Sequence, residues 1–210
     1  METKSQTQID APKIQKATRM GVPLSITTYT LPHEIEIYIA DVLSCFLTEI
    51  NQEKLKDYLG YCINELTTNA KKANTKRVYF IEKKLDINNP VDYEIGMRTF
   101  KDETLNNIAY YLQLQKDAGL YVKVLMQVKK ANILLEVRNN SEMTKTEFKR
   151  VFDKIARSRQ FTTLEEALTQ VLDDSEGAGL GLVIMILMLK KVGLNDENYE
   201  VVVENGETVT

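Results

Sequence analysis

Three polar side chains with complementary chemistry share one face of a helix that the sequence predicts over residues 51–85. The segment NELTTNAKKAN places Glu65 and Asn69 four residues apart, and Lys72 follows three residues later. Residues at this spacing lie one above another on a helix. A carboxylate can position a water or act as a general base, an amide oxygen can bind Mg²⁺, and an ammonium group can neutralise phosphate. Because the same spacing is common on solvated helix faces, the pattern by itself favours an ordinary exposed surface.

A cluster of glycines predicts an anion-binding turn elsewhere in the chain. The segment EGAGLGLVIMILMLKKVGL, residues 176–194, carries Gly177, Gly179 and Gly181 directly before an apolar helix. Backbone N–H groups at the start of a helix, together with the helix dipole, favour anions. The segment lacks the Lys-Ser/Thr pair of a P-loop, and no strand-like run precedes it as in a dinucleotide-binding turn. A glycine turn that packs against a neighbouring element is the alternative interpretation.

Helices and strands must bring these residues together. Hydrophobic periodicity and turn residues predict a mixed α/β domain over 23–210, after a polar tail at 1–22. The expected helices lie at 32–50, 51–85, 103–119, 144–158, 164–174 and 182–191, and the expected strands at 23–31, 121–128, 132–138, 199–205 and 208–210. The alternation on both sides of KKAN is typical of a β-hairpin. The last strand has barely begun where the sequence stops, so we expect a truncated C-terminus.

Composition argues against several classes of function. The chain of 210 residues has a net charge of −3 and a pI of about 5.4, which disfavours a general nucleic-acid binder. A single histidine, and two cysteines without a CxxC pair, disfavour a dedicated zinc site. The longest apolar run, 182–189, is too short to span a bilayer, and the N-terminus has no apolar signal segment. The sequence therefore predicts a cytoplasmic protein without a membrane segment.

Taken together, the motifs resemble those of the GHKL ATPases, which include histidine kinases, anti-sigma-factor serine kinases, gyrase, MutL and the heat-shock chaperone ATPases. Residues 65–73, ELTTNAKKA, are similar to the N box, and residues 176–193 are similar to the G2 box. VFDKIARS at 151–158 resembles the F box of histidine kinases, and NGETVT at 205–210 resembles the Gly-x-Thr segment that closes their sheet. The resemblance covers roughly 25–210. It implies a Bergerat-type ATP-binding fold, a two-layer α/β sandwich with a mixed, mostly antiparallel sheet and helices on one face.

The resemblance also implies roles for particular residues toward bound Mg²⁺ and ATP. Asn69 would coordinate Mg²⁺, Glu65 would act as general base, and Lys72 would contact phosphate. Phosphate contacts are further implied for Gly177, Gly179, Leu180, Gly181 and Leu182, and adenine contacts for Asn139, Ser141, Met143 and Thr208. Residues 144–176 would form a lid over the nucleotide.

One motif departs from the family. Where the family has Asp-x-Gly-x-Gly after a strand, this chain has Asn139, Ser141 and Met143 at the three defining positions. Asn139 keeps an oxygen that can accept a hydrogen bond from the adenine amino group, but it lacks the charge of aspartate. Met143 brings bulk to a position where glycine leaves room for the base. The alternative to an active ATPase is therefore a regulatory module that keeps the fold, binds nucleotide poorly and acts through protein contacts.

Two further features bear on the biological role. Residues 82–119 form an insertion with a predicted helix, which is either extra core or a docking surface for a partner. The single histidine, His33, lies too close to Asn69 for a dimerising phosphoacceptor hairpin to fit between them. The layout is closer to that of anti-sigma-factor kinases. The expected function is thus ATP-dependent protein phosphorylation by a histidine-kinase-like or anti-sigma-kinase-like domain, with a response regulator or a sigma or anti-sigma factor as partner and with homodimerisation open.

Overall fold

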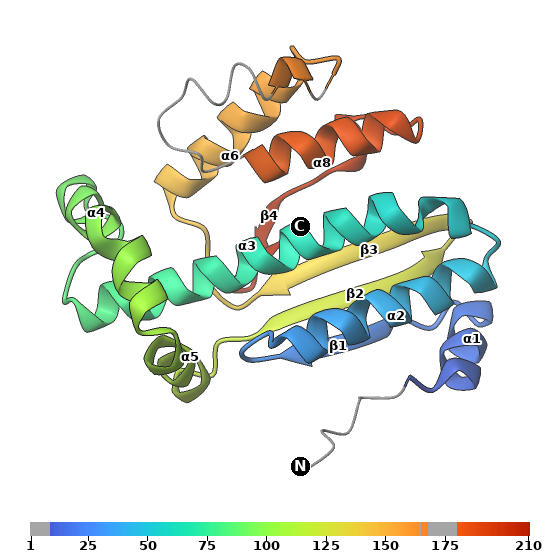
Figure 1. Ribbon diagram of the computed structural model, residues 1–210, viewed down its shortest axis with the longest axis horizontal. Helices are drawn as coiled ribbons and strands as arrows, with labels where there is room; N and C mark the ends of the chain where they lie inside the picture. The colour runs from blue at the N-terminus through green and yellow to red at the C-terminus, as the bar shows by residue number, and fades with distance from the viewer. Residues whose placement is uncertain (1–8, 164, 168–179) are drawn as a thin grey trace.

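The computed structural model describes residues 9–163, 165–167 and 180–210 (Figure 1). Its centre is an open sheet of five strands in the order β1-β2-β3-β5-β4. The strands are β1 (Leu24–Thr28), β2 (Val122–Lys129), β3 (Asn132–Asn139), β4 (Val202–Glu204) and β5 (Glu207–Val209). All pairings between these strands are antiparallel, whereas the sequence led us to expect a mixed, mostly antiparallel sheet. The chain is therefore an α/β protein built on an antiparallel sheet.

Two long helices, α2 and α3, run side by side across one face of the sheet (Figure 1). The helices are α1 (Ala11–Arg19), α2 (His33–Glu49), α3 (Lys56–Glu82), α4 (Pro90–Asn106), α5 (Ile108–Asp117), α6 (Lys145–Ser158) and α8 (Leu180–Lys191), and the short 3₁₀ turns are η1 (Glu53–Leu55) and η2 (Asp196–Asn198). The helices predicted at 32–50 and 51–85 are confirmed as α2 and α3. Because α3 extends beyond the sheet toward α4 and α5, one helix connects the sheet to the inserted segment.

The alternation of side chains in β2 decides which face of the sheet is covered. Val122, Val124 and Met126 are buried, whereas Lys123 and Leu125 between them and Gln127 after them are partly exposed. The buried side chains belong to the main core, which fills the space between the sheet and the helices α2 and α3. One face of an antiparallel sheet can remain open to water when its strands alternate in this way.

The structure differs from the predicted polar tail over 1–22, because part of this segment is a helix. Ala11–Arg19 form α1, which begins where the Asp10 side chain accepts a hydrogen bond of 3.1 Å from the backbone N–H of Lys13. Ile14 lies on the inner face of α1, is only 6% exposed and joins the main core. The prediction was wrong because tertiary packing against a larger element, here α2, stabilises a short polar helix that would be marginal alone.

The insertion expected over 82–119 contains two helices rather than one. We call α4 and α5 together the α4–α5 lobe. The lobe shares a core of its own with the end of α3, formed by Val78, Tyr79, Phe80, Tyr93, Phe100 and Tyr111. Gly96 allows α4 to approach α3 closely, because a Cβ atom there would lie 2.6 Å from the Phe80 ring. The extra-core interpretation is therefore right for the inner faces of the lobe.

The long apolar run at 182–189 forms most of helix α8. Its side chains, among them Val183, Ile186 and Leu187, are buried because α8 packs against both α3 and α6. A helix that is apolar on all sides belongs in a protein interior. Among the described residues, no helix combines the length and the hydropathy that crossing a membrane would require.

Candidate functional site

A cavity of about 250 Å³ lies beside α3, where α6, α8, β3 and β5 meet it. We call it the α3 cavity. Most of the residues that the sequence motifs singled out line it, namely Glu65, Asn69, Lys72, Asn139, Met143, Leu182 and Thr208. These residues come from separate parts of the chain, and α3, α8 and β3 are neighbours only in the folded molecule (Figure 1). The fold thus collects the predicted residues at one place.

At one end of the α3 cavity, a carboxylate and an amide of α3 face the first turn of α8. Asn69 Nδ2 donates a hydrogen bond of 2.8 Å to Glu65 Oε1, so the four-residue spacing joins the two side chains as expected. A Cβ atom built on Gly181 would overlap the Glu65 carboxylate, so this carboxylate rests directly against the α8 backbone. Any larger residue at position 181 would displace Glu65.

Asn69 has one polar atom left for a ligand. Its amide nitrogen is committed to Glu65, and no described residue donates a hydrogen bond to its Oδ1. An amide oxygen is a suitable Mg²⁺ ligand, and Mg²⁺ at phosphate sites takes few protein ligands beside water and phosphate oxygens. Within the described ranges, no group of three or more His, Cys, Asp and Glu side chains could hold a metal ion. A metal held by Asn69 would therefore need most of its ligands from water and a bound phosphate group.

Lys72 stands one turn further along α3, at a rim that the α3 cavity shares with a larger groove. Desolvation lowers the pKa of its ammonium group, Lys76 and Lys101 lower it as well, and Glu65 opposes them. Lys72 makes no hydrogen bond or ion pair with any residue that the structure describes. Repulsion between neighbouring cations is relieved when an anion binds between them. The position of Lys72 is therefore suited to a phosphate group.

The other end of the α3 cavity is a buried network of amide and hydroxyl groups. Asn139 Nδ2 donates hydrogen bonds to Ser141 Oγ at 2.7 Å and to Asn74 Oδ1 at 3.3 Å. Thr208 Oγ1 donates to the Ser141 carbonyl oxygen at 2.7 Å, and Asn74 Nδ2 donates to the Tyr121 carbonyl oxygen at 2.9 Å. The side chains of the network are at most 8% exposed. Each polar group that it removes from water thus has a partner, as burial requires.

The network fixes which side of the Asn139 amide faces the cavity. The Ser141 carbonyl can only accept a hydrogen bond, and Asn74 turns its oxygen toward Asn139 because its nitrogen is committed to Tyr121. Asn139 Nδ2 must therefore point toward these acceptors. No described residue donates to Asn139 Oδ1, and no buried side-chain oxygen or nitrogen in the described residues lacks a partner, so Oδ1 faces the cavity. The buried end offers a free hydrogen-bond acceptor.

Only some of the remaining predicted site residues line the α3 cavity. Met143 lines the cavity and narrows it, whereas Ser141 is turned away into the buried network. Leu180 begins α8 without lining the cavity, so its predicted contact is not seen here. Gly177 and Gly179 lie outside the described residues, and their phosphate contacts stay predictions.

A buried ion cluster that the sequence analysis missed joins α3 to the start of α6. Glu147 accepts hydrogen bonds of 2.6 Å from both Lys76 Nζ and Arg77 Nη2, and it completes a capping box with Thr144. Burial would raise the pKa of Glu147, but the hydrogen bonds and charges of Arg77 and Lys76 outweigh it and hold the pKa at about 2. The first part of the segment 144–176, expected to form a lid, is thus a helix tied to α3. The Thr-x-x-Glu spacing was the available signal.

Two tyrosines complete the walls of the cavity and were also missed. Tyr199 lies near Glu65, and burial raises the pKa of its phenol, which the Glu65 carboxylate raises further. Tyr93 of α4 accepts hydrogen bonds from Lys76 Nζ at 3.4 Å and from Arg150 Nη1 at 3.2 Å. The α4–α5 lobe therefore contributes a wall of the site. Neither tyrosine carries a local sequence signal, because both reach the cavity through tertiary packing.

Comparison with known proteins gives a relative but no family. The chain is 57% identical over 206 residues to a protein of Treponema pallidum (strain Nichols) that is described as uncharacterized. The similarity covers 98% of this chain and 40% of the relative, so the chain spans about 40% of the length of the protein it matches. No family model matches the chain, and no solved structure matches it. The sequence motifs and the geometry of the α3 cavity are therefore what a functional assignment can rest on.

Proposed function

We propose that this chain is a GHKL-type ATP-binding domain that holds Mg-ATP in the α3 cavity. The observation that carries the proposal is a cavity whose two ends differ as the two ends of a nucleotide do. The end formed by Glu65, Asn69 and Lys72 offers a carboxylate, a free amide oxygen and an ammonium group to a metal and phosphates. The end formed by Asn139 and Thr208 offers the free Asn139 Oδ1 atom, which faces the cavity, to the adenine amino group.

The architecture supports the same assignment. An antiparallel sheet with α2 and α3 across one face agrees with the Bergerat-type two-layer sandwich that the motifs imply. Helix α8 begins at the end of the glycine-rich segment, and its first turn lies against Glu65. The N-terminus of a helix at this place adds a favourable potential for phosphate.

The chain's own residues have distinct tasks in this proposal. Asn69 would hold Mg²⁺, which neutralises phosphate charge when bound. Glu65 would position a water or accept a proton, and its hydrogen bond with Asn69 keeps the carboxylate in place. Lys72 would neutralise phosphate oxygens at the rim. The reaction we propose is ATP-dependent phosphorylation of a protein.

The setting that we propose is cytoplasmic signalling, with a response regulator or a sigma or anti-sigma factor as partner. The acidic balance of the chain, with a net charge of −3, fits a protein partner better than a nucleic acid. His33 is exposed in the first turn of α2, 3.2 Å from the Glu36 carboxylate, and does not line the α3 cavity. The phosphoryl acceptor would therefore belong to another protein or to a second copy of the chain.

A second candidate is a regulatory module that keeps the fold and binds nucleotide poorly. The size of the α3 cavity favours it, because about 250 Å³ is below the roughly 300–1,000 Å³ of most ligand sites. Met143 occupies part of the wall at the adenine end, where the family has glycine. A nucleotide would fit only after the Met143 side chain had moved.

Calorimetric titration with Mg-ATP distinguishes the two candidates. We expect the parent chain to bind Mg-ATP and Asn69→Ala to bind it at least about 100-fold more weakly, because even outer-shell partners of a metal contribute 10- to 100-fold. Asn64→Ala is the matched control, since Asn64 is also an exposed asparagine of α3 but does not line the cavity. Its affinity should equal that of the parent. A parent chain that gives neither heat nor a thermal shift with Mg-ATP would leave the regulatory module as the better assignment.

A further inference from the structure

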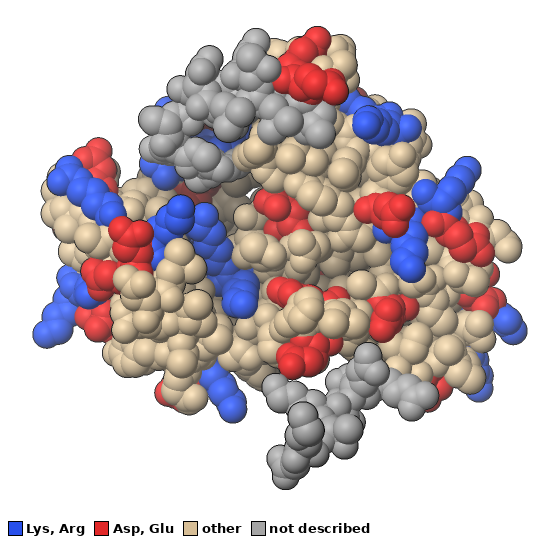
Figure 2. Space-filling model, viewed as in Figure 1, with Lys and Arg blue, Asp and Glu red and all other residues tan. Residues whose placement is uncertain are grey.

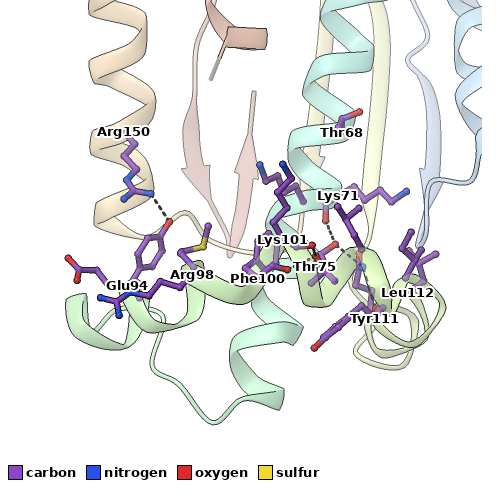
Figure 3. Close-up of a pocket in the computed structure, with 17 residues that line it drawn as sticks. Thr68, Lys71, Thr75, Glu94, Arg98, Phe100, Lys101, Tyr111, Leu112 and Arg150 are labelled. Atoms are coloured by element: carbon purple, nitrogen blue, oxygen red, sulfur yellow. Dashed lines mark hydrogen bonds between the residues drawn. The ribbon is translucent and has the colours of Figure 1, made fainter. Parts of the chain in front are cut away.

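A second and larger cavity, of about 860 Å³, lies between α3 and the α4–α5 lobe (Figure 3). We call it the lobe groove. It shares Lys72, Tyr93, Met97 and Arg150 with the α3 cavity, so the two spaces adjoin at a common wall. Its volume is within the roughly 300–1,000 Å³ that small-molecule sites occupy. The proposed nucleotide site makes no use of the rest of this groove.

Positive charge dominates the walls of the lobe groove. Its charged lining residues among the described ones are the cations Lys71, Lys72, Arg98, Lys101 and Arg150 and the carboxylate Glu94. They come from α3, α4 and α6, and Figure 3 draws them as sticks with the other residues that line the groove. In Figure 2, Lys and Arg side chains gather over α3 beside the α4–α5 lobe. Such a concentration of one sign contrasts with the net charge of −3 of the whole chain and attracts anions.

These cations have few partners of opposite charge. Lys72, Arg98 and Lys101 make no hydrogen bond or ion pair with any residue that the structure describes. Lys71 donates to the Leu31 carbonyl oxygen at 3.2 Å, and Arg150 donates to a neutral tyrosine hydroxyl. Lys101 also lies close enough to Lys72 to disfavour its charged form. A set of cations held together in this way is stabilised by binding an anion.

The floor and rim of the lobe groove are apolar. Phe100 and Tyr111 are buried beneath it, and Met97 lines the side toward the α3 cavity. Leu105 and Ile108, on the rim, are 57% and 52% exposed. Large apolar side chains with that much exposure beside a cavity offer contact area that a ligand can cover. A ligand for this groove needs an apolar body as well as a negative charge.

We propose that the lobe groove is a second binding site, for a small amphipathic anion with a phosphate or carboxylate head and an apolar body. The head contacts Lys101 beside Lys72, and the body lies over Phe100, Leu105 and Ile108. Because Lys72 borders both cavities, an anion in the lobe groove changes the electrostatic potential at the proposed phosphate end of the other site. The lobe groove thus gives the inserted helices a regulatory role that their own core does not explain.

Titration calorimetry with octyl phosphate, below its micelle concentration, tests this site on the whole chain. We expect octyl phosphate to bind at least about tenfold more tightly than inorganic phosphate, because the chain adds apolar contact. Octyltrimethylammonium, which has the same body and a positive head, should not bind. Equal affinities for octyl phosphate and inorganic phosphate, or binding of the cation, would overturn the proposal.

Substitutions in the lobe groove test whether octyl phosphate binds there. Lys101→Glu should weaken octyl phosphate about tenfold, since it reverses a charge beside the head. Lys129→Glu is the control, because Lys129 is an exposed lysine at the end of β2, away from the groove. Leu105→Ser should weaken octyl phosphate but leave inorganic phosphate unchanged, and its exposed position spares the fold. Octyl phosphate binding that is the same in Lys101→Glu as in Lys129→Glu would place the ligand elsewhere and reject the site.

Three further experiments identify the source of the anion and distinguish binding in the lobe groove from binding at the nucleotide site. Sedimentation with phosphatidylglycerol vesicles, abolished by Lys101→Glu, would assign the same chemistry to a lipid headgroup. Binding of a glutamate-rich peptide without any binding of octyl phosphate would overturn the proposal in favour of a protein partner. Asn69→Ala should bind octyl phosphate normally, so a failure of the ATP assignment would not affect this result.

Discussion

The two ends of the α3 cavity contrast in how they are built. Glu65, Asn69 and Lys72 belong to consecutive turns of a single helix, and Asn69 and Lys72 are exposed at the rim. Asn139 and Thr208 belong to paired positions of β3 and β5 and are almost fully buried. The first end depends on the periodicity of one helix, and the second depends on a strand register between distant segments.

At the first end, a residue proposed to bind ligand can be replaced with little loss of folding stability. At the second end, the same residues contribute to both ligand binding and stability. Exposed residues such as Asn69 can change at little cost to folding, because water replaces their lost partners. A buried amide such as Asn139 cannot lose a partner cheaply, because water does not reach the network. Substitutions at the two ends should therefore give different ratios of stability loss to loss of nucleotide binding.

The largest effect on stability is expected from Asn139→Asp. The new carboxylate would face the Ser141 carbonyl oxygen and the Asn74 Oδ1 atom, and both are acceptors. Placing an uncompensated charge in a buried network costs about 3–5 kcal/mol, which urea unfolding at pH 7 would measure. Asn132→Asp, an exposed change on the same strand, should cost less than about 0.5 kcal/mol. A loss below about 1 kcal/mol for Asn139→Asp would show that the buried end is not a structural network.

A smaller loss of stability is expected from Glu147→Gln, which removes the ion pairs that join α6 to α3 at the wall of the cavity. The pKa of Glu147 is about 2 in the folded protein against an ordinary value of 4.5, so its ion pairs contribute fully above about pH 4.5. This contribution, roughly 3 kcal/mol, is lost as the pH falls from 4.5 toward 2. The stability difference between parent and variant should therefore shrink over that range.

The matched control for this change is Glu142→Gln. Glu142 is exposed nearby, and only its backbone carbonyl oxygen takes part, by accepting a hydrogen bond of 2.6 Å from Arg77. Its stability should stay within about 0.5 kcal/mol of the parent, because the substitution leaves the main-chain acceptor in place. If Glu147→Gln behaved like this control in acid unfolding, the ion cluster would contribute nothing to the attachment of α6.

Gly181→Ala should affect binding without reducing stability. Alanine is favoured over glycine inside a helix by about 1 kcal/mol, but its Cβ atom would displace the Glu65 carboxylate and with it the hydrogen bond from Asn69. We expect Mg-ATP affinity to fall about tenfold, or about 1.4 kcal/mol, while the melting temperature holds or rises. Gly60→Ala in α3 is the control, since its Cβ atom would meet only Leu43 at 4.0 Å. Unchanged affinity in Gly181→Ala would mean that the contact with α8 does not position Glu65.

The smallest effect is expected from Met143→Ala at the buried end. Shortening this side chain enlarges the α3 cavity without touching the hydrogen-bond network, because Met143 lines the wall and Ser141 carries the network. Affinity for ATP should rise severalfold, and affinity for free triphosphate should not change. Met20→Ala, at a residue that is 66% exposed and distant from the cavity, serves as control. No gain for ATP would indicate that the cavity does not receive adenine at this wall.

The sequence predicted the first end of the cavity better than the second. Helical periodicity is local, so the shared helix face of Glu65 and Asn69 followed directly from their spacing, and the structure adds a hydrogen bond between them. The network around Asn139 could not be predicted, because it depends on the pairing of Asn139 with Thr208 and on Asn74 from α3. For this reason an adenine contact was expected for Ser141, although its side chain faces away from the cavity.

The same distinction explains the errors in the fold. α2, α3 and the β2–β3 hairpin have clear periodicity or alternation and were predicted close to their observed bounds. α1 has few apolar side chains. α1 and α4 are helical because Asp10 and Asn89 cap them and larger elements bury one face of each. Partners far apart in the chain supply that burial, so local patterns carry little information about it.

The position of β5 has a consequence for the order in which the protein assembles. β5 pairs with β3 on one side and β4 on the other, and it follows both in the sequence. During synthesis, β3 therefore leaves the ribosome long before its neighbour and exposes an unpaired edge, which is a template for aggregation. Thr208 arrives with β5, so the buried end of the α3 cavity is incomplete until β5 has been made. A nucleotide that binds there would stabilise only chains in which β5 has joined the sheet, and nucleotide binding would report that β5 is in place.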